Sequence, residues 1–177
     1  AEDAASADNS RVRGAQQVVQ QFQRELGGRL KQALQSDGPA AGIRVCAQAA
    51  PRIAARLSRD KGWRITRVSS QVRNPLLGTA DAWEQQVLGE FRDRRAEGEA
   101  YAGMHEAQVV SEPQGRSFRY MQAIPTQGVC LTCHAERSEL AAPVREALAE
   151  QYPHDQATGY QVGELRGAFS VKWSLDR

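Results

Sequence analysis

The sequence predicts an α+β domain, in which helices near the N-terminus cover an antiparallel sheet built mainly from the second half of the chain. In the first third of the chain, apolar residues recur at intervals of three and four, which is typical of amphipathic helices. Near the C-terminus they alternate with polar residues, which is typical of a strand. The 177 residues suffice for one domain with a substantial core. We therefore expect a single domain over residues 10–177, after a flexible tail over residues 1–9.

The first predicted helix covers residues 10–34. Its apolar positions lie on one face, and they are Val12, Ala15, Val19, Phe22, Leu26, Leu30 and Leu34. It ends in the Ser-Asp-Gly-Pro turn at 36–39, because glycine and proline interrupt helices. This apolar stripe is expected to pack on the core, and a homodimer through this helix is a second possibility.

The second predicted helix covers residues 43–57 and places Cys46 on its apolar face. Pro51 interrupts this segment, because proline has no N–H group to donate to the carbonyl of Ala47. We expect the helix to kink or restart at Pro51, close to the Cys46 thiol.

The middle of the chain is predicted to alternate between strands and helices. In order, we expect a strand over 63–69, a turn at 73–75, a helix over 82–97, and strands over 101–111 and 116–124. Asp81 and Glu84 have the spacing of a capping box at the start of this helix. The last two strands are predicted to form a hairpin with a four-residue connection at 112–115.

The C-terminal part is predicted to contain a helix over 138–152, with Pro143 in its first turn, and a strand over 165–175. Apolar residues of the strand recur at every second position and should share one face; they are Leu165, Phe169, Val171, Trp173 and Leu175.

The pattern Cys130-Leu131-Thr132-Cys133-His134 is the attachment signature of c-type haem. Thiols three residues apart can both reach the vinyl groups of one porphyrin and form thioether bonds. The adjacent His134 then lies beneath the iron, where a neutral imidazole nitrogen is a suitable axial ligand. We therefore expect one covalently bound haem c.

The motif has three other possible interpretations. A zinc site would need two more ligands at short spacing, and the other Cys and His residues are scattered. A thioredoxin-like dithiol normally follows a strand directly, whereas a loop at 125–128 precedes this motif. A structural disulfide with a chance histidine is the third alternative.

Haem attachment of this kind takes place outside the bacterial inner membrane, so we expect a periplasmic protein. The small, acidic start of the chain is what cleavage of a signal peptide leaves. No run approaches the roughly 18 apolar residues of a membrane span. With 23 basic and 21 acidic residues the charge is too balanced for a nucleic-acid surface.

Cys46 is the one cysteine left after two thioether bonds, and its role stays open at this point. A free cysteine often only packs in the core, but a thiolate can also ligate haem iron. The rival candidates for a second axial ligand are Met104, His105, Met121 and His154.

The chain resembles a bacterial family of exported c-type haem domains with a PAS-like fold, from about Gln16 to Val171. The resemblance rests on seven short segments, which lie at 46–51, 62–63, 73–75, 81–84, 130–134, 159–160 and 163–168. It implies that Cys46 is the second axial ligand. Glu164 departs from the family pattern, in which we expect an aspartate.

The function expected from the motif and the resemblance is one-electron transfer by an exported monohaem cytochrome whose protein redox partner is not identified. The alternative is a sensor of redox state, nitric oxide or carbon monoxide. An enzyme is the least favoured class, because two axial ligands leave no open position on the iron. Arg67 and Arg73 are candidate partners of the haem propionates, and solvated surface arginines are the alternative.

Overall fold

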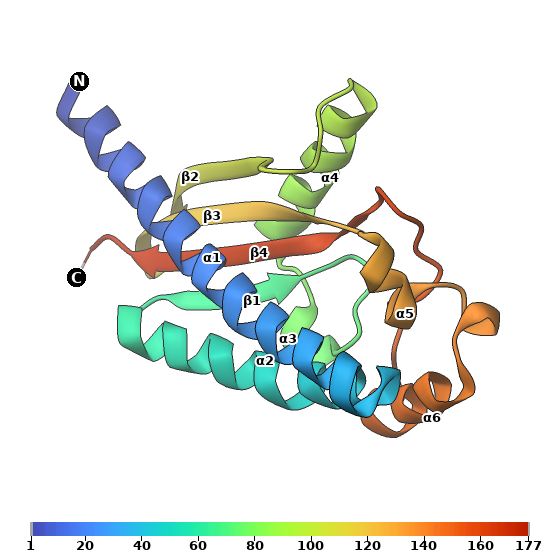
Figure 1. Cartoon of the computed structure of the whole chain (residues 1–177). Helices are drawn as coiled ribbons and strands as arrows, with labels where there is room; N and C mark the ends of the chain where they lie inside the picture. The colour runs from blue at the N-terminus through green and yellow to red at the C-terminus, as the bar shows by residue number, and fades with distance from the viewer. Residues whose placement is uncertain (1, 177) are drawn as a thin grey trace.

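A computed structural model describes residues 2–176, with side chains from residue 8 onward. In chain order its elements are α1 (Glu2–Asp37), α2 (Pro39–Lys61), β1 (Arg64–Val68), α3 (Pro75–Gly78), α4 (Ala82–Ala96), β2 (His105–Glu112), β3 (Gly115–Pro125), α5 (Leu131–His134), α6 (Ala142–Gln151) and β4 (Leu165–Ser174) (Figure 1). Single 3₁₀ turns at Gly128–Cys130 and Arg137–Glu139 flank α5.

The four strands form one antiparallel sheet in the order β1-β4-β3-β2. The C-terminal strand β4 therefore lies inside the sheet, where Val171 is flanked by Ile65 on β1 and by Tyr120 on β3. Two long helices precede the sheet in the chain. The predicted α+β class with an antiparallel sheet is confirmed, whereas the likeness to PAS domains stays a prediction.

Helix α1 begins earlier than the sequence pattern indicates. Residues 2–9, predicted as a tail, continue the helix, while residues 1 and 177 lie outside the described residues. No glycine or proline interrupts residues 2–9.

Helix α2 runs through Pro51 without restarting. Its packing against α1 and α6 maintains the helix where proline removes one hydrogen bond. Gly62 ends α2 in a left-handed conformation, with φ of 69°.

The sheet buries both of its faces, because alternate residues of each strand point to opposite sides. Figure 1 shows α1 and α2 on one side and α4 on the other. The core on the α1 and α2 side contains Ala15, Val18, Val19, Phe22, Leu26, Ala50, Ile53, Leu57, Ile65, Phe118, Tyr120, Phe169 and Val171. The core on the α4 side contains Val68, Ala80, Val87, Leu88, Phe91, Tyr101, Met104, Met121, Ala123 and Ala168.

A β-bulge lies at the start of β4. Gly167 pairs with Ile124, but Leu165 pairs with the next residue of β3, Pro125, so Arg166 is the extra residue. The bulge reverses the alternation, and Leu165 packs with the α4 side. The prediction that Leu165 shares a face with Phe169 was therefore wrong.

The structure tests the predictions for the start of α4, the β2–β3 connection and the turn at 73–75. The capping box at α4 is confirmed, with reciprocal hydrogen bonds between Asp81 and Glu84. The β2–β3 connection has two residues, 113–114, instead of four. The turn at 73–75 leads into the short helix α3, which Asn74 caps. Within residues 2–176, none of the helices combines the length with the apolarity that a membrane crossing requires.

Candidate functional site

The Cys-x-x-Cys-His motif forms a compact helical segment, which a two-residue connection at 126–127 separates from β3. The 3₁₀ turn at Gly128–Cys130 continues into α5, which ends at His134. The Cys130 sulfur accepts a hydrogen bond from the Gln127 N–H at 3.3 Å, and both thiols are half-buried. The two cysteines and the histidine therefore lie at one end of the fold, beyond the end of β3 (Figure 1).

The His134 ring is held by the carbonyl of Ala157, which lies 2.7 Å from Nδ1. A carbonyl only accepts hydrogen bonds, so Nδ1 carries the proton and Nε2 keeps its lone pair. Burial and the positive charges of Arg166 and Arg73 lower the pKa of His134 to about 2. The imidazole is therefore neutral, which is the form that binds a metal.

Cys46 lies on α2, which packs against α5 and α6. It lines the same cavity as Cys130, Cys133 and His134. Burial raises the pKa of the Cys133 thiol to about 11 against the opposing effect of Arg73, and Cys46 and Cys130 contribute to the rise. The three cysteines are free and come together from two distant parts of the sequence.

The cavity itself has a volume of about 530 Å³, within the range of small-molecule and cofactor sites. Much of its wall is apolar, including Phe22, Leu26, Leu30, Leu34, Ala50, Ile65, Leu77, Ile124 and Val129. All six residues predicted as cofactor or metal partners line it, namely Cys46, Arg67, Arg73, Cys130, Cys133 and His134.

Arg73 is a buried residue whose Nε and Nη2 atoms have protein partners. It forms an ion pair with Asp155, whose side chain is fully buried, at 3.1 Å. It also donates to the carbonyls of Cys133 and Ala157, at 2.6 and 3.0 Å. Because Ala157 holds His134, these bonds give Arg73 a positioning role, and its contact with a propionate stays a prediction.

Arg166 is a site residue that the sequence reasoning missed. Its Nε lies 3.4 Å from His134 Nε2, and its guanidinium packs over the Tyr160 ring, 5.3 Å from the centroid. Arg166 stood in one of the segments that carried the family resemblance. Regular strand alternation, however, predicts that the Arg166 side chain lies on the α4 side of the sheet. The sequence contains no signal for the bulge that changes this.

The other candidate axial ligands lie away from the cavity. Met104 and Met121 are buried on the α4 side of the sheet. His105 stacks on Tyr120, and His154 is exposed in the loop after α6. Among the Cys, Met and His side chains of residues 8–176, the cavity wall includes only those of Cys46, Cys130, Cys133 and His134.

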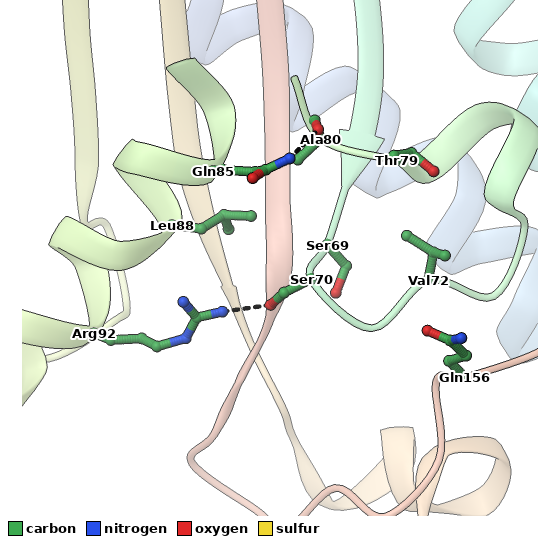
Figure 2. A pocket seen from close by; sticks show the side chains of 9 residues that line it. All are labelled: Ser69, Ser70, Val72, Thr79, Ala80, Gln85, Leu88, Arg92 and Gln156. Carbon is green, nitrogen blue, oxygen red and sulfur yellow. Dashed lines mark hydrogen bonds between the residues drawn. The ribbon is translucent and has the colours of Figure 1, made fainter. Parts of the chain in front are cut away.

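A second cavity, of about 560 Å³, lies between α4 and the segment 69–80 (Figure 2). Ser69 and Val72 line both cavities, whereas Gln85, Leu88 and Arg92 belong to the second alone. Arg92 donates to the Ser70 hydroxyl at its edge. None of the predicted site residues lines this cavity.

The fold and cavity together define a class of protein, an α+β domain whose Cys-x-x-Cys-His segment faces a cysteine on an N-terminal helix. The chain belongs to the Tll0287-like family, whose profile matches residues 2–174. The crystal structure of the cyanobacterial heme-protein Tll0287 is similar, with a TM-score of 0.72 and 23% sequence identity, over 95% of this chain and 97% of that chain. That likeness shows a shared fold. A search of curated proteins found no match.

Proposed function

We propose that this protein is an exported monohaem c-type cytochrome that carries one electron. Haem c is attached through Cys130 and Cys133, with His134 and Cys46 as axial ligands. The observation that carries the proposal is that one cavity gathers a Cys-x-x-Cys-His segment and a further cysteine from α2. The family's named member, a heme-protein, supports the choice of cofactor.

The residues of the cavity fit a haem group. Its apolar walls suit the porphyrin faces, and its two thiols belong to an attachment signature. The Ala157 carbonyl fixes the His134 tautomer with the lone pair on Nε2, where iron would replace the hydrogen bond that Nε2 accepts from Arg166 Nε. The bound group would supply a one-electron iron couple.

Each side chain has a definite task in this proposal. Cys130 and Cys133 hold the ring covalently, while His134 and Cys46 occupy the two axial positions. Arg73 keeps the His134 segment in place through Asp155 and the Ala157 carbonyl. Because the chain itself fills both axial positions, we propose electron transfer rather than enzymatic turnover.

A sensor of nitric oxide or carbon monoxide is the second candidate function. Cys46 lies one helical turn before Pro51, where α2 lacks the hydrogen bond to the Ala47 carbonyl. The missing hydrogen bond would make it easier for Cys46 to move away from a bound metal, which would let a gas molecule bind there. Carbon monoxide added to the reduced protein separates the two functions, since rapid conversion of the spectrum supports sensing and inertness supports electron transfer.

The location and partners follow from the same proposal. Haem attachment to this motif requires export, so we propose a periplasmic protein that meets a protein redox partner there. Dimerisation through α1 stays a prediction, which sedimentation of the purified protein tests.

Intact-mass measurement of the protein, expressed with an export signal and the haem-attachment machinery, tests the proposal. We expect the polypeptide plus one haem, and a pyridine haemochrome spectrum typical of two thioether bonds. The Cys130→Ser/Cys133→Ser variant is the control and should lack covalent haem. A bare polypeptide in the wild-type preparation would refute the proposal.

A further inference from the structure

The cavity carries positive charge that protein carboxylates do not balance. Of its arginines, Arg73 pairs with Asp155, and Arg64 lies 4.0 Å from Glu84. Within residues 8–176, neither Arg67 nor Arg166 has a carboxylate within ion-pair distance. Two guanidinium groups thus face the cavity without anionic partners.

These two charges are costly where they lie. Arg67 and Arg166 are both half-buried, and in the described part of the chain the partners of Arg166 are neutral: the His134 ring nitrogen, the Gln71 carbonyl and the Tyr160 ring. Arg67 packs over the Phe22 ring, 5.5 Å from its centroid, on the wall of the cavity. A buried cation without a counter-charge destabilises a fold unless a ligand supplies the missing anion.

The backbone directs Arg166 to this place. As the extra residue of the bulge, Arg166 leaves the alternation of β4, so that it and its neighbour Gly167 both line the cavity. Arg67 comes from β1, the adjacent antiparallel strand, where it is paired with Phe169. Bulges often redirect a side chain toward a functional site, and here the bulge brings a second guanidinium to the side of the sheet that Arg67 faces.

We propose that Arg67 and Arg166, which have no carboxylate partner among the described residues, bind the two propionate carboxylates of the haem, whereas the charge of Arg73 is already balanced by Asp155. This inference rests on the proposed function, because it takes haem as the occupant of the cavity. Guanidinium groups match carboxylates in charge and in hydrogen-bond geometry. The propionate edge then lies against β1 and the start of β4.

The proposal accounts for the charge of the whole site. Ferric iron in a porphyrin dianion with one thiolate ligand has no net charge. Its two ionised propionates then balance the two otherwise unpaired guanidinium groups. An arginine in this position also stabilises the ferrous form relative to the more positive ferric form.

Arg67→Gln and Arg166→Gln in the haem-loaded protein test the inference. In each variant we expect the propionate bending band of the resonance Raman spectrum to shift. Loss of one guanidinium should also favour ferric over ferrous iron about tenfold, which lowers the reduction potential by about 59 mV. Arg166→Lys keeps the charge and should keep most of the potential while shifting the band.

Arg64→Gln is the matched control, because it removes an equal charge from the same cavity wall, but from a side chain that is 56% exposed. It should leave the band in place and barely change the potential. Unchanged propionate bands in both Arg67→Gln and Arg166→Gln would overturn the inference. If one variant fails to fold, the propionate band of the other variant tests the inference. The pyridine haemochrome spectrum of each variant shows separately whether haem is attached, which tests the proposed function.

Discussion

At the scale of single residues, the sequence motif and the folded structure both indicate His134 as a metal ligand. The motif identifies His134 as a candidate ligand. The structure shows that Nδ1 donates a hydrogen bond to the Ala157 carbonyl and that burial keeps the ring neutral, and both favour metal binding. Neither is visible in the sequence, because Ala157 lies in a loop without regular structure. Predicting a ligand from sequence is therefore easier than predicting what orients it.

Cys46→Ala is the residue-scale test of the proposed thiolate ligand. An anionic sulfur stabilises ferric iron, so removing it should raise the reduction potential. If the thiolate binds ferric iron about ten-thousand-fold more tightly than ferrous iron, the rise is roughly 240 mV at about 59 mV per decade. Spectroelectrochemical titration measures it.

Cys46→Met is the matched variant, since it keeps a sulfur ligand without the negative charge. Its potential should also rise, with loss of the thiolate-type ferric spectrum. An unchanged spectrum and potential in Cys46→Ala would contradict ligation by Cys46. The proposal that haem is attached through two thioether bonds would not be affected.

At the scale of elements, the predictions that held depend on local patterns. The capping box of α4 and the alternation of β4 from Gly167 onward are encoded within a few neighbouring residues, and the structure contains both. The continuity of α2 through Pro51 depends instead on packing against α1 and α6, and the bulge at Arg166 depends on pairing with β3. Such features involve residues far apart in the sequence, so local patterns do not predict them.

The N-terminal cap of α4 gives a stability test with a defined pH dependence. Burial alone would raise the pKa of Asp81, but hydrogen bonds from Arg119 and the Glu84 N–H outweigh it, and the pKa lies below its ordinary value. A lowered carboxyl pKa stabilises the fold above the unfolded-state value of about 3.8, and the contribution is lost as the pH falls through the folded-state pKa.

Asp81→Ala should therefore lower the free energy of unfolding by about 1 kcal/mol at neutral pH, and by less in strong acid. Urea unfolding at several pH values measures it. Asp93→Asn, at an exposed position in the same helix, is the control and should change little. An equal loss for Asp81→Ala at every pH would contradict the ionic part of the argument.

Gly167 allows a test of the strand geometry beside the bulge. A Cβ atom added there would collide with the backbone carbonyl of Val68. Gly167→Ala should thus force the strands apart and lower the free energy of unfolding by about 1–3 kcal/mol. Thermal unfolding followed by circular dichroism is a suitable measurement.

Gly27→Ala is the matched control, because a Cβ at this helical position meets no neighbour within 4 Å. It should stabilise the protein by about 0.5–1 kcal/mol. If Gly167→Ala stabilised the protein as much as Gly27→Ala does, the result would contradict the close contact between Gly167 on β4 and Val68 on β1.

At the scale of the whole molecule, the cavity lies where α1, α2, the sheet and the motif segment converge (Figure 1). The sequence indicated the class of fold and six residues of this cavity, because both follow from periodicity, motif and resemblance. The uncompensated charge of Arg67 and Arg166 became visible only when three-dimensional packing gave every other arginine of the wall a carboxylate neighbour.

A ligand that fills this cavity binds the folded state and should stabilise the entire chain. The Cys130→Ser/Cys133→Ser variant, which lacks covalent haem in our proposal, should therefore unfold at a lower temperature than the wild type in calorimetry. Cys46→Ala keeps the thioether bonds and should stay nearer the wild type. Equal melting temperatures for all three proteins would contradict a haem-filled core.

The position of β4 has a consequence for how such a protein can diverge. This strand contributes to the cores on both faces of the sheet, and its first residues form part of the cavity wall. A one-residue insertion within it would turn Phe169 and Ala168 toward each other's side and carry Arg166 out of the cavity. Relatives are thus expected to gain or lose length in exposed segments such as 97–100, and to keep the distance from Arg166 to Val171 fixed.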